Sequence, residues 1–96
     1  MKTKNYAANV SIVMGKTRRA DFRFGPYTRK RDLIRAMEKT LPENFKLEDG
    51  WINVYNEYGR TENIEYISDI KNGKMYTYEH DWLYKKVTYH TYKFGK

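Results

Sequence analysis

The sequence contains no cysteine, only two histidines and only two prolines in 96 residues. Without cysteine, a disulfide framework and a thiolate zinc site are both excluded, and this composition fits a reducing compartment such as the cytosol. Because two histidines and scattered carboxylates form no recognisable ligand spacing, we expect neither a metal site nor a cofactor.

Long apolar runs are also missing, so no stretch of the sequence reaches the length needed to cross a bilayer. Residues 1–15 place lysines before an apolar run, as secretion signals do. However, Asn9 and Ser11 interrupt that run, and no cleavage pattern follows. We therefore expect a cytoplasmic protein that does not bind membranes.

The residues that are abundant indicate a folded chain. Hydrophobic residues make up 40% of the sequence and aromatic residues 17%, whereas disordered chains are poor in aromatic side chains. A chain of 96 residues has the size of one domain, so we expect residues 1–96 to form a single unit.

The net charge of +7 is distributed unevenly along the chain. Residues 1–35 carry ten Lys or Arg against two Asp, and residues 84–96 carry four lysines and no acid. Residues 36–83 are acidic, with ten Asp or Glu against five cations. Such segregation creates a local field stronger than the total charge implies.

Hydrophobic periodicity predicts the secondary structure. Alternating apolar residues indicate strands over 6–14 and 20–24, joined by a basic hairpin connection over 15–19. We expect a break over 25–28 with Thr28 as N-cap, and then an amphipathic helix over 29–41. The apolar face of this helix is expected to contain Leu33, Ile34, Met37 and Leu41.

The second half of the sequence is expected to be strands, after a loop over 43–50. The expected strands cover 51–55, 63–70, 75–79 and 86–94. Asn72-Gly73 is a strong hairpin signal, and Trp51 and Trp82 are expected to anchor the core. The predicted fold class is therefore α+β, a small single domain in the order ββαββββ. One amphipathic helix would pack on a mainly antiparallel sheet.

The candidate binding site is the run of cations between residues 16 and 35. Six of its eight cations are arginines, and the only other arginine of the chain is Arg60. Arginine offers a planar fork that suits phosphate or carboxylate. The expected contacts to a nucleic acid or an anionic partner are Lys16, Arg18, Arg19, Arg23, Arg29, Lys30, Arg31 and Arg35. These residues would form one surface from the hairpin tip and the helix N-terminus.

Tyrosine is the second candidate feature, with eight of ten tyrosines after residue 50. Strand aromatics that face solvent can stack on unpaired bases, although tyrosine is also an ordinary strand residue. We expect Tyr76, Tyr78 and Tyr92 to supply such stacking.

The function predicted from these features is non-enzymatic nucleic-acid binding. Signatures of RNA-recognition, KH and helix–turn–helix domains are absent. The first alternative is a protein-binding inhibitor or regulator of a nucleic-acid enzyme, of the phage or mobile-element type to which inhibitors of CRISPR nucleases belong. The second alternative is a small toxin-like ribonuclease that uses His80 or His90. The strand over 86–94 is also a candidate edge for homodimer formation.

Overall fold

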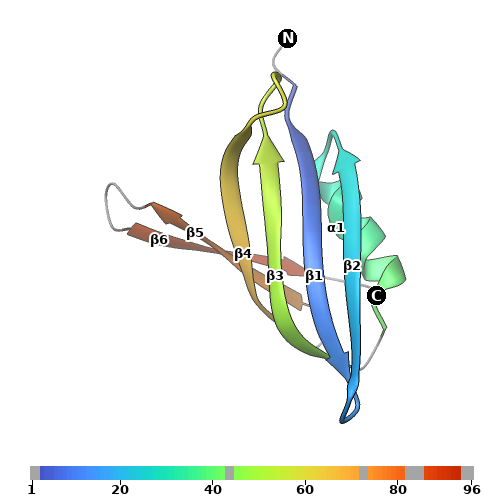
Figure 1. Ribbon diagram of the computed structural model, residues 1–96. Helices are drawn as coiled ribbons and strands as arrows, with labels where there is room; N and C mark the ends of the chain where they lie inside the picture. Colours follow the sequence, from blue (N-terminus) through green and yellow to red (C-terminus); the bar gives the residue numbers. More distant parts are fainter. Residues whose placement is uncertain (1–2, 43–44, 72–73, 82–85, 94–96) are drawn as a thin grey trace.

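The computed structural model describes residues 3–42, 45–71, 74–81 and 86–93, which form a six-stranded antiparallel sheet and one helix (Figure 1). The elements are β1 (Asn5–Met14), β2 (Arg18–Tyr27), α1 (Lys30–Thr40), β3 (Lys46–Tyr55), β4 (Thr61–Lys71), β5 (Lys74–Asp81) and β6 (Lys86–Lys93). The prediction of a small α+β domain with one helix on an antiparallel sheet is confirmed. No helix in these ranges has the length and apolar character that a membrane span requires.

The core lies between α1 and one face of the sheet. The predicted helix face is buried, with Leu33 and Met37 fully inaccessible and Ile34 nearly so. These side chains meet the inward residues of β1, of which Val10 and Ile12 are central. Full burial of such a side chain stabilises a fold by about 1.5 to 3 kcal/mol, so this contact fixes the helix on β1 and β2.

Several expected boundaries differ from the structure, among them the start of α1, the end of β2 and the start of β3. The N-cap of α1 is Arg29 and not Thr28, and no side chain caps the helix. β2 runs through Gly25 and Pro26 to Tyr27, because these two residues lie in a register shift of the β1–β2 pair. Proline is tolerated there since β2 is an edge strand. The expected loop over 43–50 is already strand from residue 46 onward.

The sheet has the strand order β2-β1-β3-β4-β5-β6. It twists strongly toward β5 and β6 (Figure 1). In Figure 1, β5 and β6 cross behind the other strands on the side where α1 lies. A register shift between Ile67 and Asp69 of β4 contributes to this bend, because an extra residue in one strand increases the local twist. The sheet therefore has a concave face that holds α1 and a convex face without a helix.

Two sequence expectations concern residues outside the described ranges, the Asn72-Gly73 turn and Trp82. The flanking strands do pair antiparallel, with Lys71 opposite Lys74. Trp51 is half-buried on the convex face and does not belong to the buried core cluster, so its expected role as a core anchor is wrong.

Gly25 is the position where we expect a side chain to be least tolerated. Its φ is +96°, and a Cβ atom would lie 2.6 Å from the carbonyl oxygen of Tyr6. We expect Gly25→Ala to destabilise the fold by at least about 2 kcal/mol, through strain and overlap with backbone. Gly15→Ala is the matched control, because Gly15 has a φ of +65° but open space around it. That control should cost about 1 kcal/mol. Urea denaturation of both variants measures the difference, and equal losses would contradict the expectation.

Candidate functional site

The basic residues of the predicted site do not meet at one place, because β2 separates the hairpin from the helix. Lys16 and Arg18 lie at the β1–β2 connection, whereas Arg29 caps α1 at the opposite end of β2. Ten residues of strand span about 30 Å at the usual rise of a β-strand. The expectation of one hairpin-and-helix surface is therefore corrected. The cations are spread from the β1–β2 connection along β2 to α1.

The eight cations also differ in their contacts. Lys30 turns inward and donates a hydrogen bond from Nζ to Oε1 of Glu65, so it is not the outward-facing contact that the sequence predicted. Nε of Arg19 lies 2.9 Å from Oε2 of Glu48. The other six cations are exposed, namely Lys16, Arg18, Arg23, Arg29, Arg31 and Arg35.

Four aromatic residues cross the convex face of the sheet in register. Trp51 of β3 lies opposite Tyr66 of β4. Tyr66 lies opposite Tyr78 of β5, which in turn lies opposite Tyr89 of β6. Directly paired residues of antiparallel strands share a face, so these four side chains form one line, here called the aromatic row.

The rings of the aromatic row contact one another. Tyr66 and Tyr78 stack with ring centroids 5.5 Å apart, and Tyr78 and Tyr89 lie 5.8 Å apart with tilted planes. Tyr89 exposes 71% of its surface, against 38% for Tyr66. Because Tyr78 has ring neighbours on both sides, the most accessible ring of the row is that of Tyr89.

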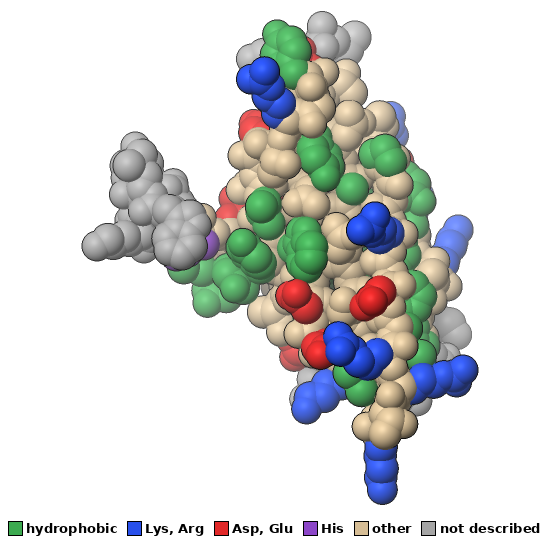
Figure 2. Space-filling view, in the orientation of Figure 1, with side chains coloured by type: hydrophobic (Ala, Val, Ile, Leu, Met, Phe, Trp, Pro, Cys, Tyr) green, Lys and Arg blue, Asp and Glu red, His purple; other side chains and the backbone are tan. Residues whose placement is uncertain are grey.

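Charged residues surround the aromatic row on the convex face. The row continues through Asn9 of β1 to Arg23 of β2. Lys74 lies on the same face at the start of β5. Asp21 and Asp49 stand opposite one another across β1, between the row and the hairpin connection. Figure 2, in the orientation of Figure 1, shows hydrophobic side chains over the middle of this face and Lys and Arg mainly toward its ends.

The three tyrosines expected to stack do not share a face. Tyr76 and Tyr78 both lie on the convex face of β5, as the alternation predicted. Tyr92 pairs with Met75, whose side chain is buried on the concave face. Tyr92 therefore points to the helix side and is removed from the set of candidate stacking residues.

Sequence reasoning missed the aromatic row because the β4–β5 pairing changes register. Counting back from the Lys71–Lys74 pair would place Tyr66 opposite Glu79, on the concave face. The extra residue in β4 at Ser68 shifts this pairing, so that Tyr66 meets Tyr78. The Oγ of Ser68 donates a hydrogen bond of 3.2 Å to the carbonyl oxygen of Tyr76 beside the shift.

A second cluster of polar side chains lies on the concave face around Glu65. The Glu65 side chain is only 3% exposed, and that of Lys30 is 27% exposed. The two form an ion pair that links α1 to β4. Oε2 of Glu65 accepts weak hydrogen bonds from the hydroxyls of Thr77 and Tyr92, at 3.4 and 3.3 Å. The Lys30 ammonium also lies 5.3 Å from the centroid of the Tyr92 ring.

The ion pair keeps both of its members charged. Burial alone would lower the pKa of Lys30, but the interactions with Glu65 and Tyr92 together outweigh burial and raise that pKa above its ordinary value. Burial would likewise raise the pKa of Glu65, but Lys30 outweighs burial and holds that pKa below its ordinary value. For Tyr92, burial dominates and raises the pKa of the phenol.

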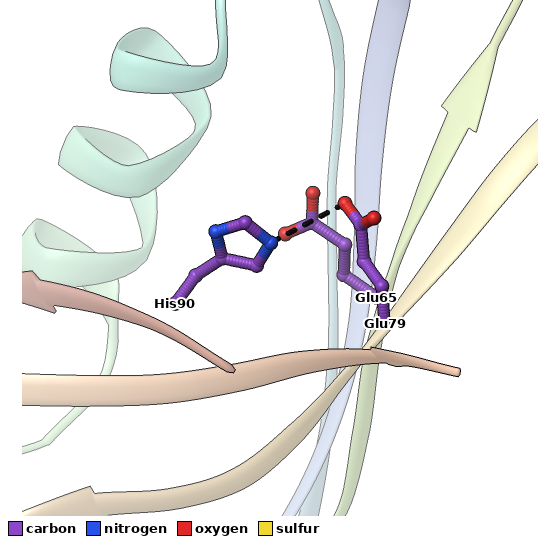
Figure 3. Close-up of side chains that lie close together, drawn as sticks. All are labelled: Glu65, Glu79 and His90. Atoms are coloured by element: carbon purple, nitrogen blue, oxygen red, sulfur yellow. Dashed lines mark ion pairs between the residues drawn. The ribbon is translucent and has the colours of Figure 1, made fainter. Parts of the chain in front are cut away.

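Glu79 and His90 complete this concave cluster (Figure 3). Nε2 of His90 lies 3.4 Å from Oε1 of Glu79. The donor atoms of Glu65, Glu79 and His90 all lie within 4.8 Å of one another, which makes them the residues able to hold a metal ion in the described part of the chain. His80 is adjacent to Glu79 and opposite Val87, so it lies on the convex face. The two histidines therefore cannot act together as an acid–base pair.

We expect the Lys30–Glu65 pair to show strong energetic coupling. Glu65→Gln leaves a half-buried ammonium without its carboxylate and should cost about 2 to 4 kcal/mol. Lys30→Met should cost a similar amount, because it leaves a buried carboxylate without its cation. The double variant should lose clearly less than the two single losses combined, since neither charge is then left alone. Urea denaturation with a chelator present measures all three variants, and simple additivity would contradict the coupling.

The structure thus offers two surfaces, the aromatic row on the convex face and the Glu65 cluster on the concave face. Both are built from paired strand residues, so neither depends on a deep pocket. Their chemistry differs, because one surface presents aromatic rings and the other presents charged oxygen and nitrogen atoms.

Comparison of the chain with protein-family models, with curated proteins and with solved structures finds no match.

Proposed function

We propose that this protein binds single-stranded nucleic acid without catalysis, across the convex face of its sheet. The observation that carries the proposal is the aromatic row, in which Trp51, Tyr66, Tyr78 and Tyr89 line up on four adjacent strands. Proteins that bind single strands combine such stacking platforms with a positive electrostatic field. A base stacked on an aromatic side chain contributes about 1 to 3 kcal/mol, and unpaired bases are accessible for this contact.

The accessible end of the row is the point where stacking would begin. Tyr66 and Tyr78 already cover each other at 5.5 Å, which leaves no room for a base between them. Tyr89 ends the row at the edge strand and is largely exposed. A base would therefore extend the existing stack from the Tyr89 ring, while the other rings hold that ring in place.

Phosphate contacts would come from cations on both sides of the row. Arg23 lies in line with it on β2, and Lys74 lies on the same face of β5. The net charge of +7 adds a long-range attraction to any polyanion. Arg29, Arg31 and Arg35 lie exposed on and beside α1, where they support this field without bordering the row.

We expect loss of the exposed ring to reduce binding of single strands specifically. Tyr89→Ala should weaken binding of labelled oligo(dT) and oligo(U) by about ten-fold, the value of one stacked base. Tyr58→Ala is the matched control, because Tyr58 is 79% exposed but lies in the β3–β4 turn, away from the row. Fluorescence anisotropy measures both variants. Equal affinities for Tyr89→Ala and Tyr58→Ala would show that the row does not contact the bases.

Charge reversal should give a different signature from loss of a ring. Replacing Arg23 and Lys74 by Glu should weaken binding and also flatten its dependence on salt. The log–log slope falls by about 0.7 for each lost phosphate contact on a single strand. Tyr89→Ala should lower the affinity and leave that slope unchanged, because stacking releases no counterions. A slope that stays the same in this charge-reversal variant would mean that Arg23 and Lys74 do not contact phosphate.

The alternative proposal is a protein-binding regulator, because exposed tyrosines also serve protein interfaces. The acidic residues Asp21 and Asp49 near the row favour this alternative, since they would repel a phosphate chain at that point. A pull-down from nuclease-treated extract separates the two proposals. A partner that stays bound after nuclease treatment, with no affinity for oligonucleotides, would replace the nucleic-acid proposal by the regulator proposal.

A further inference from the structure

Three metal-ligating side chains from three adjacent strands converge on the concave face. Glu65 of β4 lies directly opposite Glu79 of β5. His90 of β6 lies opposite Thr77, two residues along β5 from Glu79. All three therefore project from the same face, and their donor atoms lie within 4.8 Å of one another (Figure 3).

The Nε2 atom of His90 faces the two carboxylates (Figure 3). It is buried, and it has no hydrogen-bond partner, the one side-chain nitrogen or oxygen in this state among the described residues. The 3.4 Å contact with Oε1 of Glu79 is an ion-pair distance without hydrogen-bond alignment. A buried ring nitrogen is normally satisfied, so an Nε2 directed at two carboxylates (Figure 3) indicates a ligand that is shared among them.

The surroundings of Glu65 resemble the outer shell of a metal site. Lys30 donates its hydrogen bond to Oε1 of Glu65. Oε2 accepts long hydrogen bonds from Thr77 and Tyr92. Ligating carboxylates are commonly oriented by such partners. The charges also allow an ion, because the two carboxylates and the Lys30 ammonium together carry a net charge of −1.

We propose that Glu65, Glu79 and His90 bind one divalent transition-metal ion, for which Zn²⁺ is the best match. The donor set of one imidazole and two carboxylates suits Zn²⁺, and three protein ligands leave a fourth position open to water. Zinc bonds of about 2.0 to 2.2 Å place tetrahedral ligand atoms about 3.4 Å apart. The donor atoms now lie up to 4.8 Å apart, so zinc binding requires side-chain rotations that bring them to that spacing. This site is independent of the aromatic row and of the nucleic-acid proposal.

The test is titration of the full-length, chelator-stripped protein with Zn²⁺, read by isothermal calorimetry and by competition with a chromogenic chelator. The wild-type protein should bind one equivalent with micromolar or tighter affinity and should show a raised Tm. His90→Gln and Glu79→Gln should each weaken binding by at least about ten-fold, because each removes a ligand. Acidification should also weaken binding, because the proton and the metal compete for Nε2.

His80→Gln is the matched control, because it removes the other histidine of the chain from the opposite face of β5. It should leave zinc binding unchanged. Circular dichroism of each variant separates loss of the site from loss of the fold. Glu79→Gln is the gentler variant, because glutamine has the same shape as the half-buried glutamate that it replaces. Absence of saturable zinc binding by the folded wild-type protein would overturn the proposal. Equal weakening by His80→Gln and His90→Gln would overturn it as well.

Discussion

The ion pair between Lys30 and Glu65 is the constraint on which the arrangement of the molecule depends. Apolar contacts hold α1 on β1 and β2, whereas this pair ties the start of α1 to β4. Burial of an ionised carboxylate costs several kcal/mol, which only a close and well-bonded cation offsets. The position of Lys30 also explains a feature that is unfavourable locally. A cation in the first turn of a helix opposes the helix dipole by some tenths of a kcal/mol, and here the carboxylate of Glu65 offsets that cost.

The bend of the sheet gives its two faces different chemistry. On the concave side, α1 covers β1 and β2, and polar side chains fill the space toward β5 and β6. On the convex side, no helix of the described chain covers the strands, so their outward residues remain accessible (Figure 1). The register shift in β4 links these two effects, because it bends the sheet and also places Tyr66 on the convex face.

The sequence predicts those features of the fold that depend on the local periodicity of hydrophobic residues. The apolar faces of the first strand and of the helix follow from spacing alone, and residues such as Val10, Ile12 and Leu33 are buried as expected. The aromatic row could not be predicted in this way, because a single extra residue in β4 reverses the face of every side chain beyond it. The sequence also could not predict that the Lys30 side chain turns inward, since its partner Glu65 lies 35 residues away in the sequence.

The two candidate surfaces share the backbone of β5 and β6, and this sharing has a physical consequence. Tyr78 and Glu79 are neighbours on β5 that point to opposite faces, and Tyr89 and His90 are the corresponding neighbours on β6. The backbone pairing of β5 with β6 fixes the spacing of these two strands. The same spacing sets the contact between the Tyr78 and Tyr89 rings, which lie 5.8 Å apart. Apolar residues of similar volume could replace the buried Lys30–Glu65 ion pair without loss of stability. Stability alone therefore does not account for the charged groups around Glu65. The metal ion proposed above accounts for them, because two carboxylates and an imidazole are donor groups that an apolar core would not supply.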